Sequence, residues 1–207
     1  MEKQQQPLGK RIYKQTAHWS RWFHLYLSMV SFLILLFFAI TGITLNHTEW
    51  FADQQKTTTL KDTVPMAWVE AKLDTIAIKK LEIVERFRNK FGIKGALTEF
   101  IIDEYQCTVS FNGPGYAVAA FVNRENGIVE INETYVGWVG VLNDLHKGRD
   151  TGSKWKWLID ISAVLMILVS ITGLMMLFFL KSKRIAGLAV IIVGGILCWL
   201  VYYFGVQ

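Results

Sequence analysis

Three long apolar blocks constrain the fold of this 207-residue chain more than any other feature. They run from Trp22 to Leu45, from Trp157 to Leu180 and from Ile185 to Phe204, and Asp160 is the one Asp, Glu, Lys or Arg within them. A helix needs roughly 20 apolar residues to cross the hydrocarbon core of a bilayer. Outside closed barrels, the helix is also the form that satisfies its own backbone polar groups in lipid. The sequence therefore predicts three transmembrane helices in contact with a lipid bilayer.

Lysine and arginine side chains indicate how these helices are oriented. They gather before the first block and between the second and third, as Lys3, Lys10, Arg11, Lys14, Arg21, Lys181, Lys183 and Arg184. Short cytoplasmic flanks carry such an excess, so we expect a cytoplasmic N-terminus and an extracytoplasmic C-terminus. The first block is too long for the apolar region of a cleaved signal. These flanks supply much of the net charge of +5, which therefore needs no nucleic-acid partner.

The blocks and their flanks divide the chain into seven segments. We expect a cytoplasmic N-terminal segment (1–18), transmembrane helix 1 (19–46), an extracytoplasmic domain (47–135), an interfacial helix with a linker (136–155), transmembrane helix 2 (156–180), a cytoplasmic loop (181–184) and transmembrane helix 3 (185–204).

The polar segment between the first two helices predicts a small α+β domain. A loop rich in Thr, Lys and Asp, Gln54–Thr63, precedes apolar residues at helical spacing from Met66 to Phe91. Gly92 and Gly95 should end this helical part, which fits one or two amphipathic helices. Short segments rich in β-branched and aromatic residues then alternate with turn signals. They predict an antiparallel meander of four strands, at Leu97–Asp103, Gln106–Phe111, Tyr116–Asn123 and Ile128–Asn132.

Four short motifs add a family resemblance. They are the aromatic-basic opening His18-Trp19-Ser20-Arg21-Trp22-Phe23-His24-Leu25, Ile40-Thr41-Gly42, Leu145-His146-Lys147-Gly148 and Ile171-Thr172-Gly173. In this order and spacing the chain resembles the PepSY-associated transmembrane (PepSY_TM) proteins over nearly its whole length. The resemblance implies that 47–135 is a PepSY-like domain and that the membrane is a bacterial inner membrane. Larger members include haem-bearing reductases of ferric siderophores, whose haems are held by histidines on the spans, while others have no established activity.

His47 and His146 are the first candidates for a haem site. His47 follows the outer end of the first apolar block, and His146 ends a short predicted surface helix, Val136–His146, ahead of the second block. Neutral imidazole is a common ligand of haem iron. With the resemblance, this placement favours joint ligation of one haem b iron by both histidines. The alternative for His47 is an interfacial histidine that bonds to headgroups or to the outer domain.

His24 is a further candidate, on the cytoplasmic side. The helical rise puts it about 34 Å from His47 along the first helix, so these two histidines cannot share an iron. Met175, near the inner end of the second span, could place a thioether opposite His24, since His/Met ligation is a known haem pattern. Methionine also fills gaps in helix packing, and an intramembrane histidine can bond a neighbouring helix. Pairing of two His24 copies in a symmetric dimer is another route.

The remaining polar residues of the spans have plainer interpretations beside functional ones. Thr41-Gly42 and Thr172-Gly173 favour close helix packing, and would also leave room for a flat macrocycle. Asp160 lies one turn after Lys156, which favours a local ion pair, although bonding to a ligand histidine is the alternative. Cys107 and Cys198 form no metal-binding motif, and no nucleotide or catalytic-triad motif is present.

Two functions therefore remain open from the sequence. In the first, the chain is an inner-membrane b-type haem protein that takes part in transmembrane electron transfer, with ferric iron or a siderophore as acceptor. It would be a membrane reductase or its electron-transfer subunit, supplied by a redox partner or a membrane carrier. In the second, the spans anchor a PepSY-like binding or regulatory module that uses no cofactor. A homo-oligomer is compatible with both.

Overall fold

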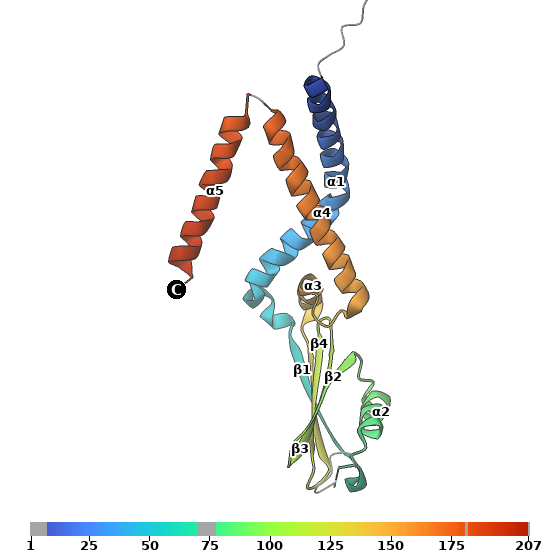
Figure 1. Cartoon of the computed structure of the whole chain (residues 1–207). Helices are drawn as coiled ribbons and strands as arrows, with labels where there is room; N and C mark the ends of the chain where they lie inside the picture. Colours follow the sequence, from blue (N-terminus) through green and yellow to red (C-terminus); the bar gives the residue numbers. More distant parts are fainter. Residues whose placement is uncertain (1–7, 70–77, 181, 207) are drawn as a thin grey trace, which may run out of the picture. The chain divides into compact units, whose positions relative to one another are not determined.

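The computed structural model describes residues 8–69, 78–180 and 182–206. Along the chain the elements are α1 (Leu8–Asn46), η1 (Thr48–Gln54), β1 (Lys56–Thr63), η2 (Met66–Trp68), α2 (Lys80–Phe91), β2 (Ala96–Ile102), β3 (Gln106–Gly113), β4 (Tyr116–Asn123), β5 (Ile128–Tyr135), α3 (Gly137–Lys147), α4 (Gly152–Phe179) and α5 (Arg184–Gly205) (Figure 1). They form two compact units. One comprises Met1–Leu36 and Asp160–Gln207, which we call the helical unit, and the other comprises Phe37–Ile159, which we call the sheet unit.

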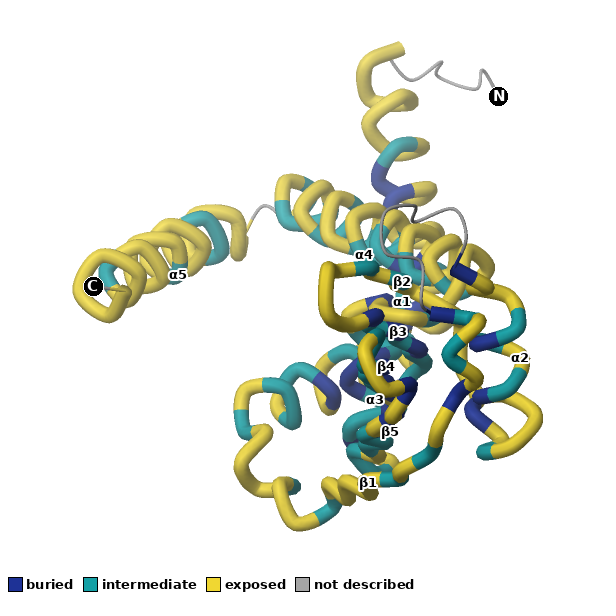
Figure 2. The backbone as a smooth tube through the Cα atoms, turned by 90° about the horizontal axis from the view of Figure 1, so that it is seen from below, coloured by how far each residue is buried: buried dark blue, intermediate teal, exposed yellow. Residues whose placement is uncertain are grey.

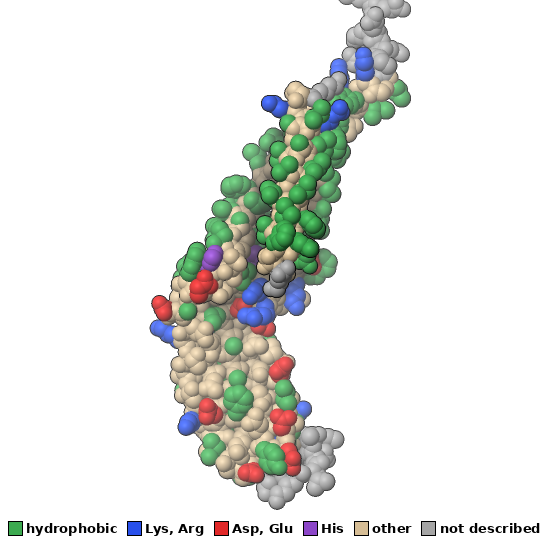
Figure 3. All heavy atoms as spheres, turned by 90° about the vertical axis from the view of Figure 1, so that its left-hand side faces the viewer, with side chains coloured by type: hydrophobic (Ala, Val, Ile, Leu, Met, Phe, Trp, Pro, Cys, Tyr) green, Lys and Arg blue, Asp and Glu red, His purple; other side chains and the backbone are tan. Residues whose placement is uncertain are grey.

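The three expected membrane helices are confirmed as α1, α4 and α5, each long and apolar enough to cross a bilayer. α1 begins at Leu8, well before the apolar block. Most side chains of these helices are exposed, and Figure 3 shows hydrophobic side chains covering their visible face. Such apolar surface is stable when lipid is the surrounding solvent. Within the helical unit, Tyr13 of α1 stacks edge-on against Phe179 of α4, with ring centroids 5.1 Å apart.

The sheet unit is built on a five-stranded antiparallel sheet in the order β1-β5-β4-β3-β2. The four strands predicted from alternation are confirmed as β2 to β5, with ends shifted by three residues or fewer. Glycines with positive φ stand at the tight connections: Gly115 turns β3 into β4, and Gly127 precedes β5. Glycine adopts this conformation at no steric cost, so the turn signals of the sequence correspond to real turns.

β1 is a correction to the sequence prediction, which gave Gln54–Thr63 as a loop. Residues Lys56 to Thr63 form an edge strand that pairs with β5 throughout, from Lys56 opposite Tyr135 to Thr63 opposite Ile128. The strand lacks an alternating apolar face, because most of its side chains are exposed. Its threonines are β-branched and suit a strand, and Thr59 donates a hydrogen bond of 2.7 Å to the Asn132 carbonyl oxygen Oδ1 across the pair.

One face of the sheet is covered by α2 and the other is open. The core contains α2 residues Ile83 and Phe87 and inward-facing strand residues such as Val109, Phe111 and Ile131. Figure 2 shows buried positions alternating with less buried ones along the strands. α2 ends at Gly92, whose left-handed conformation confirms the predicted stop. Of the predicted helical segment Met66–Phe91, η2 and α2 are helical, and residues 70–77 lie outside the described ones.

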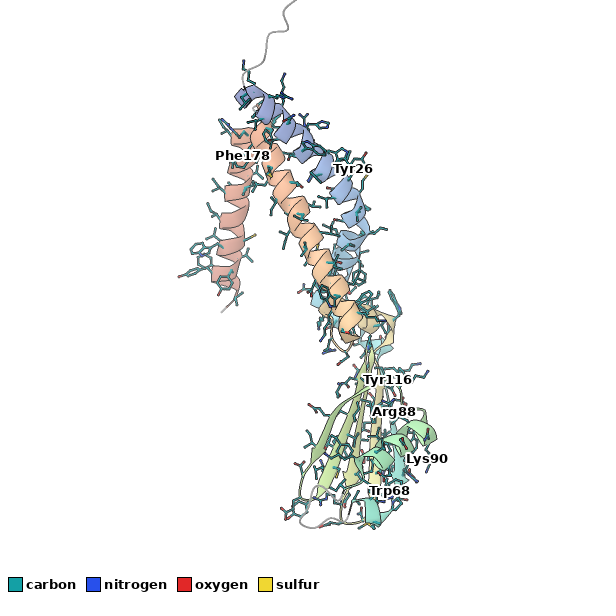
Figure 4. All side chains as sticks on the ribbon, turned by 45° about the vertical axis from the view of Figure 1, so that its right-hand side comes forward. Tyr26, Trp68, Arg88, Lys90, Tyr116 and Phe178 are labelled. Atoms are coloured by element: carbon teal, nitrogen blue, oxygen red, sulfur yellow. The ribbon has the colours of Figure 1, made fainter. Side chains whose placement is uncertain are left out.

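Asp62 fastens the edge strand β1 to α2. Its buried carboxylate accepts hydrogen bonds from Arg86 Nε at 3.1 Å and from Lys90 Nζ at 2.6 Å. Burial alone would raise the pKa of this carboxyl group, but the bonds from Arg86 and Lys90 outweigh it and lower the pKa to about 2. Figure 4 shows Lys90 and Arg88 on α2, with Tyr116 above them at the start of β4. The edge strand β1 is thus held by ion pairs to α2 as well as by its backbone hydrogen bonds to β5.

Candidate functional site

His24 of α1 reaches the Thr-Gly pair of α4 inside the helical unit. Its Nδ1 lies 3.1 Å from the backbone oxygen of Val169 and 3.1 Å from Thr172 Oγ1. A β-carbon built at Gly173 would lie 3.0 Å from Cε1 of His24, so glycine leaves the space that the imidazole ring uses. One turn earlier on α1, Ser20 donates a hydrogen bond to the Thr172 carbonyl oxygen. The histidine, the threonine and the glycine form one interlocked contact.

These bonds determine the tautomer of neutral His24. A carbonyl oxygen can only accept, so the 3.1 Å contact to Val169 O requires a proton on Nδ1. Thr172 Oγ1 lies 2.9 Å from Leu168 O and donates its own proton to the α4 backbone, so towards His24 it also accepts. A neutral imidazole with its proton on Nδ1 carries an unprotonated Nε2. Within the described part of the chain, both hydrogen bonds of His24 use Nδ1, so the lone pair on Nε2 remains available.

His146 of α3 repeats this arrangement in the sheet unit. Its Nδ1 lies 2.6 Å from Thr41 Oγ1, while that hydroxyl lies 2.6 Å from Phe37 O one turn earlier on α1. The Thr41 hydroxyl donates its proton to Phe37 O, so towards His146 it can only accept a hydrogen bond. Nδ1 of His146 is therefore the donor, and Nε2 of the neutral ring carries no proton. A β-carbon at Gly42 would lie 4.0 Å from Cε1 of His146, and the ring of Phe38 meets the imidazole edge-on at 4.9 Å. Each Thr-Gly pair thus contacts one histidine: Thr172-Gly173 contacts His24, and Thr41-Gly42 contacts His146.

His47 does not belong to either arrangement. It lies just after α1, stacks on Trp50 with ring centroids 4.0 Å apart, and its Nδ1 lies 3.1 Å from Glu49 Oε1. No hydrogen bond or ring contact among the described residues joins His47 to His146. The structure therefore places the two outer candidates in separate surroundings, with His146 against α1 and His47 beside its own neighbours in the chain.

A groove of about 680 Å³ opens beside His24 in the helical unit. Its walls come from α4 and α5 and are almost wholly apolar, and His24, Ser170 and Lys183 are its polar lining residues. The other lining residues are Val169, Gly173, Leu174, Leu177, Ala186, Gly187, Val190 and Ile191. Met175, the predicted partner of His24, is not among them and is 40% exposed. Volumes of 300–1,000 Å³ are typical of small-molecule and cofactor sites.

α3 is held in place by a buried carboxylate that the sequence analysis did not single out. Asp144 Oδ2 accepts a 2.9 Å hydrogen bond from the Gly115 backbone N–H at the β3–β4 turn, and its Oδ1 accepts one of 2.6 Å from Arg149. A β-carbon at Gly115 would collide with Val141 of α3. These contacts lock α3 to the hairpin and so fix the position from which His146 meets Thr41. The sequence offered one signal for Asp144: it is an acidic residue two positions before the candidate ligand His146.

Stability should depend on pH through His146. Burial of the ring, and secondarily the charge of Lys147, lower the pKa of His146 from its usual value. The unfolded chain then takes up a proton near pH 6.5 that the folded chain still resists, so unfolding becomes easier as the pH falls below about 6.5. The variant His146→Gln should lose this component. Thermal unfolding midpoints measured from about pH 8 to about pH 5.5 would test this, and equal pH slopes for both proteins would contradict it.

Comparison with known protein families gives a match over most of the chain. The model of the family described as "Putative PepSY_TM-like" matches residues 18–207. No curated protein and no solved structure matches the chain significantly. The matched range contains both histidine–threonine–glycine arrangements, the sheet and all of α5.

Proposed function

Since this chain belongs to the PepSY_TM-like family, we propose that it binds haem b within the membrane and takes part in passing single electrons across it. The observation that carries the proposal is that Nδ1 of His24 contacts Val169 O and Thr172 Oγ1 while the same side chain lines an apolar groove. With its proton on Nδ1, the imidazole keeps the Nε2 lone pair for a ligand bond. A histidine that ligates a metal typically donates its other ring N–H to a carbonyl or carboxylate oxygen, which fixes both tautomer and orientation. His24 has this second bond already in place.

The residues around His24 fit a haem. The groove has the volume of a cofactor site, and its walls are apolar. Gly173 has no side chain, so nothing at this position displaces the imidazole of His24. The ammonium group of Lys183, which also lines the groove, can pair with a carboxylate such as a haem propionate. When bound, haem iron supplies a centre that accepts and releases one electron. The chain's own residues orient the ligand nitrogen through the two contacts at Nδ1 of His24.

His146 supports a second, outer haem site in the same proposal. Its Nδ1–H bond to Thr41 leaves Nε2 available, as in His24. With His47 held by Trp50 and Glu49, we assign the outer ligand role to His146 rather than to the pair. The basic flanks favour a cytoplasmic N-terminus, and the family resemblance implies a bacterial inner membrane. Electrons would then move outward, to a ferric iron complex at the extracytoplasmic side.

Visible spectroscopy of the detergent-purified protein, expressed with added haem, tests this function. The reduced-minus-oxidised spectrum should show a b-type α-band that is lost or greatly reduced in His24→Ala and diminished in His146→Ala. His18→Ala is the matched control, because His18 is an exposed histidine of α1 six residues before His24. It should leave the spectrum unchanged. A wild-type protein without haem bands, or equal losses in His18→Ala and His24→Ala, would contradict the proposal.

The open face of the sheet favours a second candidate function, an anchored binding module without a cofactor. Small hydroxyl, amide and methyl side chains border a shallow pocket of about 390 Å³ there, among them Ser110, Asn112, Ala119, Asn132 and Thr134. In this function the histidine bonds join helices and nothing more. A photoreactive side chain at position 110 should then crosslink a specific partner in cells, and His24→Ala should leave this crosslink intact. Position 81, exposed on α2, is the control.

A further inference from the structure

A small polar pocket of about 180 Å³ lies in the sheet unit, where the end of α1, η1 and α3 meet. Its polar lining comes from Thr48, Gln55, Asn143, Asp144, Lys147 and Arg149. None of these residues takes part in the histidine arrangements. The pocket is therefore a separate feature that neither the family match nor the proposed function explains.

Two of the lining residues are buried polar side chains. Asn143 is 8% exposed and Asp144 is 5% exposed. Burying polar groups is costly unless they have hydrogen-bond partners. Asp144 has its partners in the Gly115 N–H and Arg149, and the Asn143 amide meets the Thr44 hydroxyl at 2.6 Å. The chain thus holds these side chains in place at a wall of the pocket, as expected for a built polar site rather than a packing gap.

The charge of the lining is positive. The carboxylate of Asp144 is neutralised by Arg149, with 2.6 Å between Oδ1 and Nη2. Among the described residues, no carboxylate oxygen lies within ion-pair distance of the ammonium group of Lys147. One cation is left over, with hydroxyl and amide groups from Thr48 and Gln55 beside it. Such a lining is complementary to a small anion with several oxygen atoms.

The neighbouring surface indicates where such an anion would come from. Trp50 of η1 and Trp138 of α3 are 63% and 67% exposed, on the two elements that form walls of the pocket. Exposed tryptophans are enriched at the headgroup level of membranes. Arg149 is paired with Asp144 and also lies 4.0 Å from Asp150, so Lys147 is the cation available to a ligand. We propose that this pocket binds a phosphate group, held by Lys147 with the polar side chains of Thr48 and Gln55 in the same lining. A phospholipid headgroup and free phosphate share this chemistry, and the experiment separates them.

The test uses the full chain in neutral detergent and measures its thermal unfolding midpoint against ligand concentration. The probes are a short-chain phosphatidylglycerol, a diacylglycerol with the same acyl chains and no phosphate, and inorganic phosphate, with chloride at equal ionic strength. Phosphatidylglycerol or inorganic phosphate should raise the midpoint with a saturable dependence. Lys147→Gln should weaken this dependence about fivefold, since one basic side chain near a membrane surface contributes on the order of 1 kcal/mol.

Lys154→Gln is the matched control, because it removes the same charge from the start of α4 outside the pocket lining. It should leave the dependence unchanged. A shift with phosphatidylglycerol alone identifies the lipid as the source, and a shift with inorganic phosphate as well identifies the free ion. Equal shifts with the phosphate-free diacylglycerol, no shift beyond chloride, or equal weakening in both lysine variants would overturn the proposal.

Discussion

Replacing Gly173 by valine should weaken haem binding at His24 at least tenfold while leaving the sheet unit folded. A β-carbon at this position would lie 3.0 Å from Cε1 of His24, which is tighter than ordinary van der Waals contact, and 3.5 Å from Nδ1. The two γ-methyl groups of valine would occupy further space beside the imidazole and the groove. The ring must then move away from Val169 and Thr172, which removes the bonds that orient Nε2. The α-band per mole of protein, at a series of haem concentrations, measures the loss.

Gly194→Val is the control for this experiment. Gly194 is also a glycine of a membrane helix, but a β-carbon there would meet nothing within 4 Å. The same change in composition should therefore leave haem binding at the wild-type level. If Gly173→Val bound haem as tightly as Gly194→Val, the contact between His24 and Gly173 would have no part in ligation, and the site would have to be sought elsewhere.

Replacing Phe87 by alanine should destabilise the sheet unit by about 3–5 kcal/mol, the range found for large buried aromatic residues. Phe87 is fully buried between α2 and the sheet, among Ile83, Val109 and Phe111. Removing the ring lowers the free energy of unfolding in two ways: the hydrophobic gain from burying the ring is lost, and a cavity is left in the core. Hydrogen exchange of backbone amides in β3 and β4, followed by mass spectrometry, reports this loss as faster exchange, by about two to four orders of magnitude.

Leu81→Ala on the same helix supplies the comparison. Leu81 is 66% exposed, so its truncation should change stability by no more than about 0.5 kcal/mol. Similar exchange rates in the two variants would show that α2 does not pack on the sheet as described. Neither substitution touches a histidine, so haem spectra should remain near those of the wild-type protein wherever the sheet unit stays folded.

Periodicity was sufficient for the elements with a strong local signal. The apolar blocks gave α1, α4 and α5, and alternation with turn residues gave β2 to β5. β1 was missed because an edge strand does not need two alternating faces, so its threonines and lysines looked like a loop. Its place is set by pairing with β5, more than 60 residues later in the sequence, and no local pattern carries that information.

The sequence was enough to identify the residues of the candidate site, but not to predict which of them contact one another. His24, His146 and both Thr-Gly pairs stood out in the sequence, but the sequence suggested His47 as the neighbour of His146. The structure pairs His146 with Thr41, and His24 with Thr172, across separations of 105 and 148 residues. A histidine at the end of a span has several helices within reach, and tertiary packing alone decides which one it meets. The structure also shows that the threonines bond both to their own backbone and across to a neighbouring helix.

The most direct test of this account is the tautomer of the two histidines. Solid-state or solution ¹⁵N NMR of haem-free protein labelled on histidine, at a pH where the rings are neutral, distinguishes protonated from bare ring nitrogens. His18→Gln and His47→Gln variants would simplify the spectrum and support the assignment. We expect Nδ1 protonated and Nε2 bare in both His24 and His146. A proton on Nε2 of either histidine would contradict the geometry from which its ligand role is inferred.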